Sequence, residues 1–112
     1  MKKKEIIKSS IEYTKIIKKC PYVKNNYFII YYRKNKEINR YGISVPTKTG
    51  KANVRNKIKR RLKNIIDKNK FTIHKPYDYV IIIRKRLLEL NYNEIENSFI
   101  NLINKIGAKN EK

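Results

Sequence analysis

Apolar residues recur at helical spacing in three separate segments of this chain. The pattern predicts helices over residues 10–19 and 54–69, and a last helix that stops at Gly107. Five apolar residues form the inner face of that last helix: Ile95, Phe99, Leu102, Ile103 and Ile106. Each predicted helix therefore has one face that must pack against another element.

Short polar motifs mark where these helices begin. The sequences SSIE at residues 9–12 and NYNE at residues 91–94 are capping boxes, in which the first side chain and the glutamate satisfy exposed backbone amides. Asn53 is the expected N-cap of the helix over residues 54–69.

Three further segments are rich in β-branched and aromatic residues, which predicts strands over residues 27–33, 40–45 and 78–84. The first strand should place two sets of side chains on opposite faces, Phe28, Ile30 and Tyr32 on one and Tyr27, Ile29 and Tyr31 on the other. The first two strands should run antiparallel because their connection is short. The third strand is apolar on both faces, so we expect it at the centre of the sheet.

The order of these elements predicts an α+β fold. We expect a two-layer sandwich of a small mixed β-sheet with three helices, in the order α-β-β-α-β-α, with room for a further short strand. A length of 112 residues indicates one domain over residues 1–112, with a short basic N-terminal tail over residues 1–8 and a C-terminal tail over residues 107–112. The longest apolar run is far shorter than the roughly 20 residues that span a membrane, so we expect a cytoplasmic protein.

The charge of the chain points to a polyanionic partner. Lysine and arginine number 29 against nine acidic residues, which gives a formal net charge of +20. A compact protein of this size repels itself at such a charge, and a nucleic acid is the first candidate to neutralise it. An acidic membrane surface is the second candidate, but the apolar face of the most basic helix is needed to pack on the sheet.

The stretch KANVRNKIKRRLKN at residues 51–64 concentrates seven basic residues and no acidic one. At about 100° per residue, one arc of the helix collects Ile58, Leu62, Ile65 and Ile66. One flank collects Asn56, Lys59, Arg60 and Lys63, the opposite flank carries Lys57 and Arg61, and Arg55 occupies the first turn. Cations near a helix N-terminus oppose the helix dipole, so this arrangement favours phosphate binding over stability.

The same region resembles the signature of the bacterial ribonuclease P protein component. The motif VRNKIKR at residues 54–60 is preceded by GISV at residues 42–45 and TKTGKA at residues 47–52, and the likeness extends over most of the chain. It includes the first predicted helix, the first strand, DYVIIIR at residues 78–84 and Tyr92. Lys57 is a departure, because the family often has arginine there, and lysine lacks the bidentate fork of a guanidinium group.

The resemblance implies a role in transfer-RNA maturation. In that family a catalytic RNA uses Mg²⁺ to hydrolyse a phosphodiester and remove the 5′ leader of precursor tRNA. This chain would be the protein subunit of that endoribonuclease, with catalytic RNA and precursor tRNA as partners and with no obligate protein partner. The implied RNA-binding residues are Arg55, Asn56, Lys57, Lys59, Arg60 and Lys63, and those of the leader-binding cleft are Tyr13, Ile17 and Tyr31.

Two structural expectations accompany the resemblance. The family has a left-handed strand-helix-strand crossover, which would fall at about residues 40–84. From spacing alone, Tyr13 and Ile17 fit an ordinary core as well as a cleft, and the aliphatic Ile17 replaces a usual aromatic residue. An aliphatic side chain can pack against a base but does not stack as a ring does.

The sequence offers no catalytic machinery or metal site of its own. The single histidine, His74, is expected on the surface, and Cys20 is expected to be a small buried apolar residue. Glu12 and Glu94 are explained by capping boxes, and Asp78 by the start of a strand. A small ribosomal or other structural RNA-binding protein is the alternative prediction, while a helix-turn-helix DNA-binding protein and an independent nuclease fit less well.

Overall fold

The structure is a computed structural model that describes residues 3–35, 38–73 and 76–110, and it excludes the side chains of residues 107–110. His74 therefore lies outside the described residues. Within the described part, no helix is long and apolar enough to cross a membrane. The principal elements are α1 (Ser10–Lys19), β1 (Tyr22–Lys24), β2 (Phe28–Lys34), β3 (Arg40–Ser44), α2 (Ala52–Lys68), β4 (Tyr77–Ile83) and α3 (Tyr92–Asn110), with 3-10 turns at η1 (Lys3–Glu5), η2 (Thr47–Thr49) and η3 (Lys85–Glu89).

The four strands form one mixed sheet in the order β1-β2-β4-β3. β1 pairs antiparallel with β2 and β2 pairs antiparallel with β4, whereas β3 pairs parallel with β4. The central place predicted for β4 is confirmed, and β1 is the further short strand. β2 and β3 do run antiparallel, but they are not neighbours, because β4, which is buried on both faces, lies between them.

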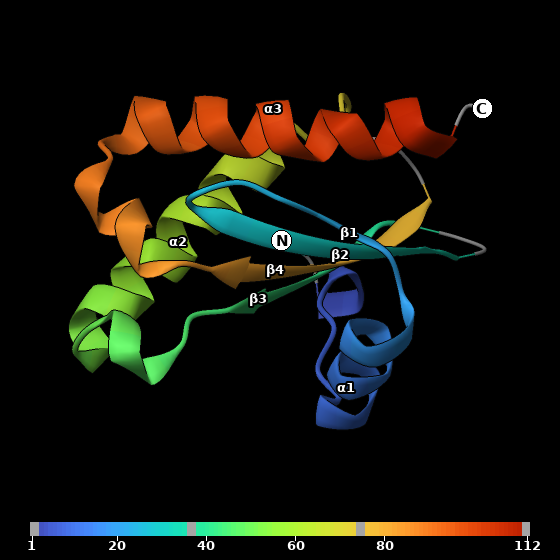
Figure 1. Ribbon diagram of the computed structural model, residues 1–112, viewed down its shortest axis with the longest axis horizontal. Coiled ribbons are helices and arrows are strands. Elements are labelled where there is room, and N and C mark those ends of the chain that lie inside the picture. The colour runs from blue at the N-terminus through green and yellow to red at the C-terminus, as the bar shows by residue number, and fades with distance from the viewer. Residues whose placement is uncertain (1–2, 36–37, 74–75, 111–112) are drawn as a thin grey trace.

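The parallel pair β3 and β4 is joined by α2, as the predicted strand-helix-strand crossover requires. The left-handed sense of this crossover stays a prediction. The crossover places α2 over one face of the sheet, with α3 beside it (Figure 1).

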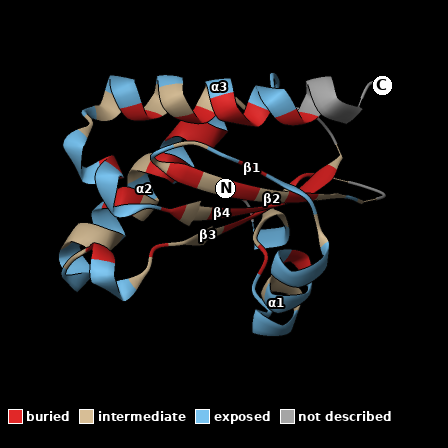
Figure 2. Cartoon of the chain, viewed as in Figure 1, coloured by how far each residue is buried: buried red, intermediate tan, exposed pale blue. Residues whose placement is uncertain are grey.

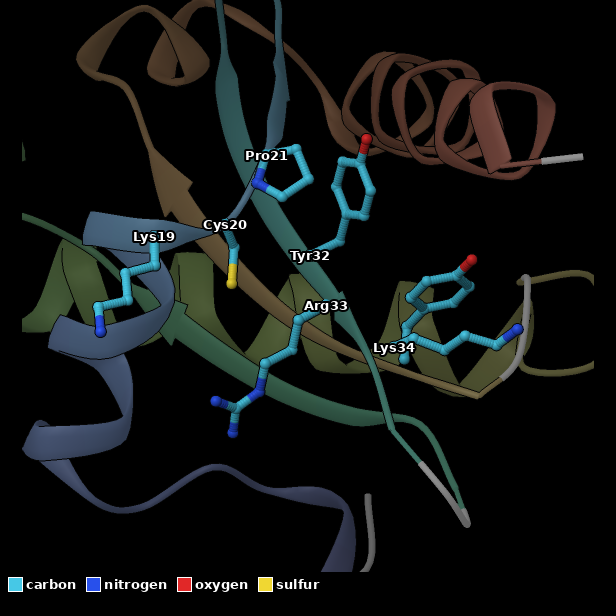
Figure 3. Close-up of a pocket in the computed structure, with 7 residues that line it drawn as sticks. Lys19, Cys20, Pro21, Tyr32, Arg33 and Lys34 are labelled. Carbon is cyan, nitrogen blue, oxygen red and sulfur yellow. The ribbon is translucent and has the colours of Figure 1, made fainter. Parts of the chain in front are cut away.

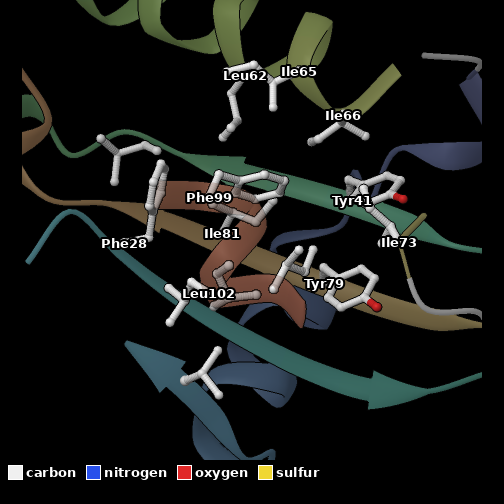
Figure 4. Close-up of a cluster of buried hydrophobic side chains, with 14 of the residues drawn as sticks. Phe28, Tyr41, Leu62, Ile65, Ile66, Ile73, Tyr79, Ile81, Phe99 and Leu102 are labelled. Atoms are coloured by element: carbon white, nitrogen blue, oxygen red, sulfur yellow. The ribbon is translucent and has the colours of Figure 1, made fainter. Parts of the chain in front are cut away.

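The main core lies between the sheet and the two helices α2 and α3 (Figures 2 and 4). It includes Phe28, Ile30 and Tyr32 of β2, whereas Tyr31 packs on the opposite face, which confirms the predicted alternation within that strand. Tyr27, predicted on the face of Tyr31, precedes β2 and packs against the main core instead. On the opposite face, α1 contributes to a smaller cluster that contains Ile16 and Val80. The predicted two layers thus gain a partial third layer from α1.

The helix boundaries agree with the predictions in most places. The capping box of α3 is formed on both sides, since the Asn91 and Glu94 amides each donate to the other's side chain at 2.9 Å. Its predicted inner face is buried, but the helix continues past Gly107 to Asn110. A glycine within a helix costs only about 1 kcal/mol relative to alanine, which does not force the helix to end.

The start of α2 differs from the prediction. The helix begins at Ala52, and its N-cap is Lys51, which makes no capping hydrogen bond through its side chain. Asn53 is therefore not the N-cap but lies in the first turn, where its Oδ1 accepts a hydrogen bond from the Val54 amide at 2.9 Å.

The segment predicted as a basic N-terminal tail joins the fold over its described part. Ile6 forms a parallel bridge with Tyr41, and the Ile7 amide donates to the Tyr41 carbonyl at 3.0 Å. Ile7 is buried against the α1 side of the sheet. This segment thus covers part of the edge of β3, which would otherwise be an unpaired edge strand.

Candidate nucleic-acid interface

α2 is held on the sheet by the residues that its helical period predicts. Ile58, Leu62, Ile65 and Ile66 are all buried. The outer flank of the helix carries a shallow pocket lined by Asn53, Asn56, Lys59, Arg60 and Lys63, which we call the basic flank. The structure thus brings together four of the six predicted RNA-binding residues, and it adds Asn53, which was predicted to cap the helix.

The basic flank concentrates uncompensated positive charge. None of its lining residues is acidic, and the first turn of α2 contains no acidic residue. Among the described residues, no ion pair involves Lys59, Arg60 or Lys63, although ion pairs occur elsewhere on the surface. The charges repel one another and also oppose the helix dipole, so binding an anion relieves both unfavourable terms.

The two other predicted residues of this set lie apart from the pocket. Arg55 is half-buried, and its Nε donates a hydrogen bond to the Gly50 carbonyl at 3.2 Å. It therefore ties the preceding loop to the first turn of α2. Lys57 is exposed but does not line the basic flank, in agreement with its place on the opposite side of the helical wheel.

The residues predicted for the leader-binding cleft come from α1 and from the sheet face that α1 covers. Tyr13 and Tyr31 both pack against the cluster that contains Ile16 and Val80. Tyr13 lies directly over Gly42 of β3, where an added Cβ would collide with the tyrosine ring. Glycine at this position therefore lets the helix approach the strand closely.

Tyr13 and Ile17 have different surroundings although both belong to α1. Tyr13 is half-buried, and this burial raises the pKa of its hydroxyl. Ile17 is 38% exposed and lies outside the buried cluster. The structure therefore packs Tyr13 on the sheet and leaves Ile17 partly exposed on α1.

An ion-pair network that the local sequence patterns did not predict joins α1 to the end of the sheet. Asp78 is only 1% exposed, and its carboxylate accepts hydrogen bonds from Arg33 at 2.9 Å, from Arg40 at 2.8 Å and from Asn35 at 2.8 Å. Both arginines also contact the Glu12 carboxylate, at 3.1 and 2.8 Å. One acid from β4 and one from α1 are thus bridged by the same two guanidinium groups.

This network corrects two interpretations made from the sequence. The Ser9 hydroxyl does accept from the Glu12 amide, but the Glu12 carboxylate contacts the two arginines and does not complete the capping box. Burial raises the pKa of Asp78, but the hydrogen bonds from Arg40, Asn35 and Arg33 outweigh it, so the pKa lies below its usual value. Asp78 therefore does more than start a strand, since it stays charged and holds both arginines.

A second pocket lies at the free edge of β2, beyond the end of β1 (Figure 3). We call it the edge pocket, and its lining residues are Lys19, Cys20, Pro21, Tyr32, Arg33, Lys34 and Tyr77. Cys20, predicted to be buried, is half-buried here and contributes to the pocket wall. Across the described ranges, no group of three or more His, Cys, Asp and Glu side chains is arranged to hold a metal ion.

The chain is similar to known proteins over most of its length. A family model described as Ribonuclease P matches residues 1–107. The ribonuclease P protein component of Mycoplasma capricolum subsp. capricolum is 41% identical over 110 residues, which cover 95% of this chain and 99% of that protein. The component from Streptococcus agalactiae is 39% identical over 108 residues, covering 96% and 98% of the two chains.

Solved structures of similar proteins have the same fold. The RNase P protein from Thermotoga maritima matches with a TM-score of 0.84 and 34% identity, covering 90% of this chain and 96% of that one. An RNase P protein mutant from Staphylococcus aureus matches with a TM-score of 0.84 and 34% identity, covering 95% and 90%.

Proposed function

This chain belongs to the ribonuclease P protein family, and we propose that one of its surfaces binds the catalytic RNA of the enzyme and another binds precursor tRNA. As a ribonuclease P protein component it is a subunit of the holoenzyme and a partner of the ribonuclease P RNA. The basic flank of α2 would bind that catalytic RNA, and the surface beside α1 would bind the 5′ leader of precursor tRNA. The alternative of a ribosomal protein finds no support among these relatives.

The observation that carries the first half of the proposal is the sign of the charge on the basic flank. Lys59, Arg60 and Lys63 line one pocket without an acidic neighbour in its wall. Contacts to phosphates position a protein on RNA without reading its sequence, and they release counterions. A folded catalytic RNA offers phosphates at high density, which suits a rigid helix that presents several cations at a fixed spacing.

The surface beside α1 has a different chemistry, which suits a single strand. It presents the tyrosine rings of Tyr13 and Tyr31 next to the arginines of the ion-pair network. Single-stranded RNA is typically bound by stacking of its bases on aromatic rings together with nearby positive charge. A 5′ leader is such a strand, whereas mature tRNA lacks it.

In this proposal the bond chemistry belongs to the RNA subunit and its Mg²⁺ ions. Metal ions would activate water and stabilise the leaving oxygen of the phosphodiester. The chain itself supplies fixed cations and rings that hold the two RNAs in place. Positioning of this kind can lower a barrier by several kcal/mol without any catalytic side chain.

Reconstitution with the cognate catalytic RNA tests this function. At a low Mg²⁺ concentration that limits the RNA alone, the wild-type chain should increase the rate of precursor cleavage. Lys59→Ala and Arg60→Ala should each weaken binding to the catalytic RNA and flatten its salt dependence by roughly 0.7 to 0.9 in log-log slope per lost phosphate contact.

The matched control is Lys105→Ala, which removes one exposed lysine from α3. It should leave the slope within error of the wild-type value. An identical slope for Lys59→Ala, Arg60→Ala and the control would reject the basic flank as the binding surface, and a wild-type chain that fails to stimulate cleavage would reject the function itself.

A further inference from the structure

Tyr22 is an exposed aromatic residue that neither the sequence motifs nor the proposed site accounts for. It lies on the three-residue edge strand β1, directly opposite Tyr31 of β2. The two rings lie 5.2 Å apart between centroids, at an angle of 48°. Tyr22 remains 46% exposed, so the pair extends the tyrosine surface beside α1 outward to the edge of the sheet.

The edge pocket begins immediately beside this pair. Pro21 precedes Tyr22, and the Pro21 carbonyl accepts a hydrogen bond from the Tyr32 amide at 3.2 Å, which continues the register of β1 and β2 by one residue. The pocket wall then contains Lys19 and Lys34, both exposed (Figure 3). Within the described chain neither lysine takes part in an ion pair, and no acidic residue lines the pocket.

This arrangement combines a ring that a flat apolar group can cover with unpaired cations in the wall of the adjoining edge pocket. A nucleotide has the complementary arrangement, since a flat base is joined through a sugar to an anionic phosphate. Any base can stack on a tyrosine ring, so such a site needs no sequence preference. Arg33 is less available to a ligand than the two lysines, because Asp78 and Glu12 already hold its guanidinium group.

We propose that Tyr22 and the edge pocket form a further subsite for one nucleotide of single-stranded RNA. The base stacks on the outer face of the Tyr22 ring, and the adjoining phosphate lies at Lys19. Lys34, which follows the face of Tyr32 along β2, adds positive charge from the other side of the same sheet edge. The subsite rests on the proposed function, because it lengthens the leader-binding surface of Tyr13 and Tyr31 by one position. Tyr22 thereby becomes a positioning residue for the leader strand.

A purely structural role for Tyr22 makes a different prediction. Facing aromatic side chains on paired strands stabilise a hairpin by up to about 1 kcal/mol. If Tyr22 only stabilised the protein, its substitution would weaken the binding of every RNA by the same factor. Stacking on a leader nucleotide would change only the binding of substrates whose leader is long enough to reach Tyr22.

The test uses the full chain bound to its catalytic RNA and precursor tRNAs whose leaders lengthen by one nucleotide at a time. With the wild-type chain, affinity should rise at the length that reaches Tyr22. Tyr22→Phe keeps a ring and should keep this rise, whereas Tyr22→Leu keeps apolar contact with Tyr31 and should lose it, which weakens binding of longer leaders roughly tenfold. Binding of mature tRNA should stay unchanged in both variants.

Ile11→Ala is the control, because it removes an exposed apolar side chain from the outer face of α1. It should keep the wild-type dependence on leader length. Crosslinking of 4-thiouridine-labelled leaders to the unaltered holoenzyme gives a second measurement that does not depend on the fold of a variant, and one leader position should crosslink to Tyr22.

An unchanged length dependence in Tyr22→Leu, or crosslinks confined to residues other than Tyr22, would overturn the subsite. The proposed function would survive that outcome as long as the wild-type chain still binds precursor tRNA more tightly than mature tRNA. Equal binding of both tRNAs by the wild-type chain would instead reject leader binding altogether.

Discussion

At the scale of single residues, Asp78 is the side chain whose surroundings depend most on the fold. It is buried in β4, and its charge is compensated by Arg33 and Arg40. Removal of one partner from a buried ion pair leaves the remaining charges unsatisfied, which is more costly than the loss of an exposed pair.

Asp78→Asn should therefore destabilise the protein by about 2 kcal/mol, because it removes the negative charge that holds both arginines together. This change is smaller than the roughly 3 to 5 kcal/mol typical of breaking a fully buried pair, because the arginine side chains are 34% and 29% exposed. Urea unfolding measures the change. Glu89→Gln, which alters an exposed pair at 3.9 Å with Arg86, should change the stability by less than about 0.5 kcal/mol. Equal effects of the two substitutions would show that the network adds no stability.

The same carboxylate makes stability depend on pH. Because the pKa of Asp78 is lower in the folded protein than in the unfolded chain, the unfolded chain binds a proton more readily. Its contribution is fully present above an ordinary aspartate pKa of about 3.9 and is lost as the pH falls through the folded-state value. The stability difference between the wild-type chain and Asp78→Asn should shrink as the pH is lowered from 6 toward 3, and a constant difference would contradict this assignment.

The sequence predicted residue positions well where local periodicity decides them. The helical period placed Ile58, Leu62, Ile65 and Ile66 on the sheet, and all four are buried. The roles of Glu12 and Asp78 could not be predicted in this way. Their partners are distant in sequence, and the alternative of local capping satisfied the pattern around Glu12 equally well.

At the scale of elements, α2 combines a well-packed inner face with an N-terminus that is poorly suited to helix stability. Its first turn has no acidic residue, and its N-cap makes no side-chain hydrogen bond. Both features fit an element whose first turns bind anions, because an acid there would compete with phosphate.

Asn53→Asp should have opposite effects on the stability of the helix and on its binding of anions. A carboxylate in the first turn should stabilise the protein by about 0.3 to 1 kcal/mol through the helix dipole. The same charge lies in the wall of the basic flank and should weaken binding to the catalytic RNA roughly fivefold, the effect of about 1 kcal/mol of repulsion. Urea unfolding and RNA titration give the two values. Asn101→Asp on α3 serves as the control, and an increase in both stability and affinity for Asn53→Asp would contradict the role of the flank.

Element order was predictable from the sequence, but the neighbours in the sheet were not. The short connection between β2 and β3 correctly indicated opposite directions, and the apolar faces of β4 correctly indicated a central strand. The position of β4 between β2 and β3 depends on pairing between residues that are far apart in sequence, so no local pattern predicts it. The further short strand was predicted only as a possibility, because the three residues of β1 are too few for an alternating pattern to indicate a strand.

At the scale of the whole molecule, two surfaces with different chemistry lie on different elements. The basic flank lies on α2, whereas Tyr13, Tyr31 and the ion-pair network lie between α1 and the other face of the sheet. The sheet separates α1 from α2 (Figure 1). A net charge of +20 on such a small body is tolerated best when RNA covers more than one side.

The composition predicted a polyanionic partner, and the family resemblance supplied the candidate residues for both surfaces. The structure groups Asn56, Lys59, Arg60 and Lys63 into one pocket, and it separates Arg55 and Lys57 from them. The helical wheel already set Arg55 apart from this flank, but its hydrogen bond to the loop before the helix could not be predicted from the wheel.

The most direct test of this division is to measure, for two variants, the affinity for the catalytic RNA and the preference of the holoenzyme for precursor over mature tRNA. The double variant Lys59→Ala and Arg60→Ala should weaken binding to the catalytic RNA and leave the tRNA preference unchanged. Tyr31→Ala should lower the preference roughly tenfold and leave the affinity for catalytic RNA unchanged. If each variant lowers both quantities by similar factors, the two surfaces do not bind separate parts of the RNA.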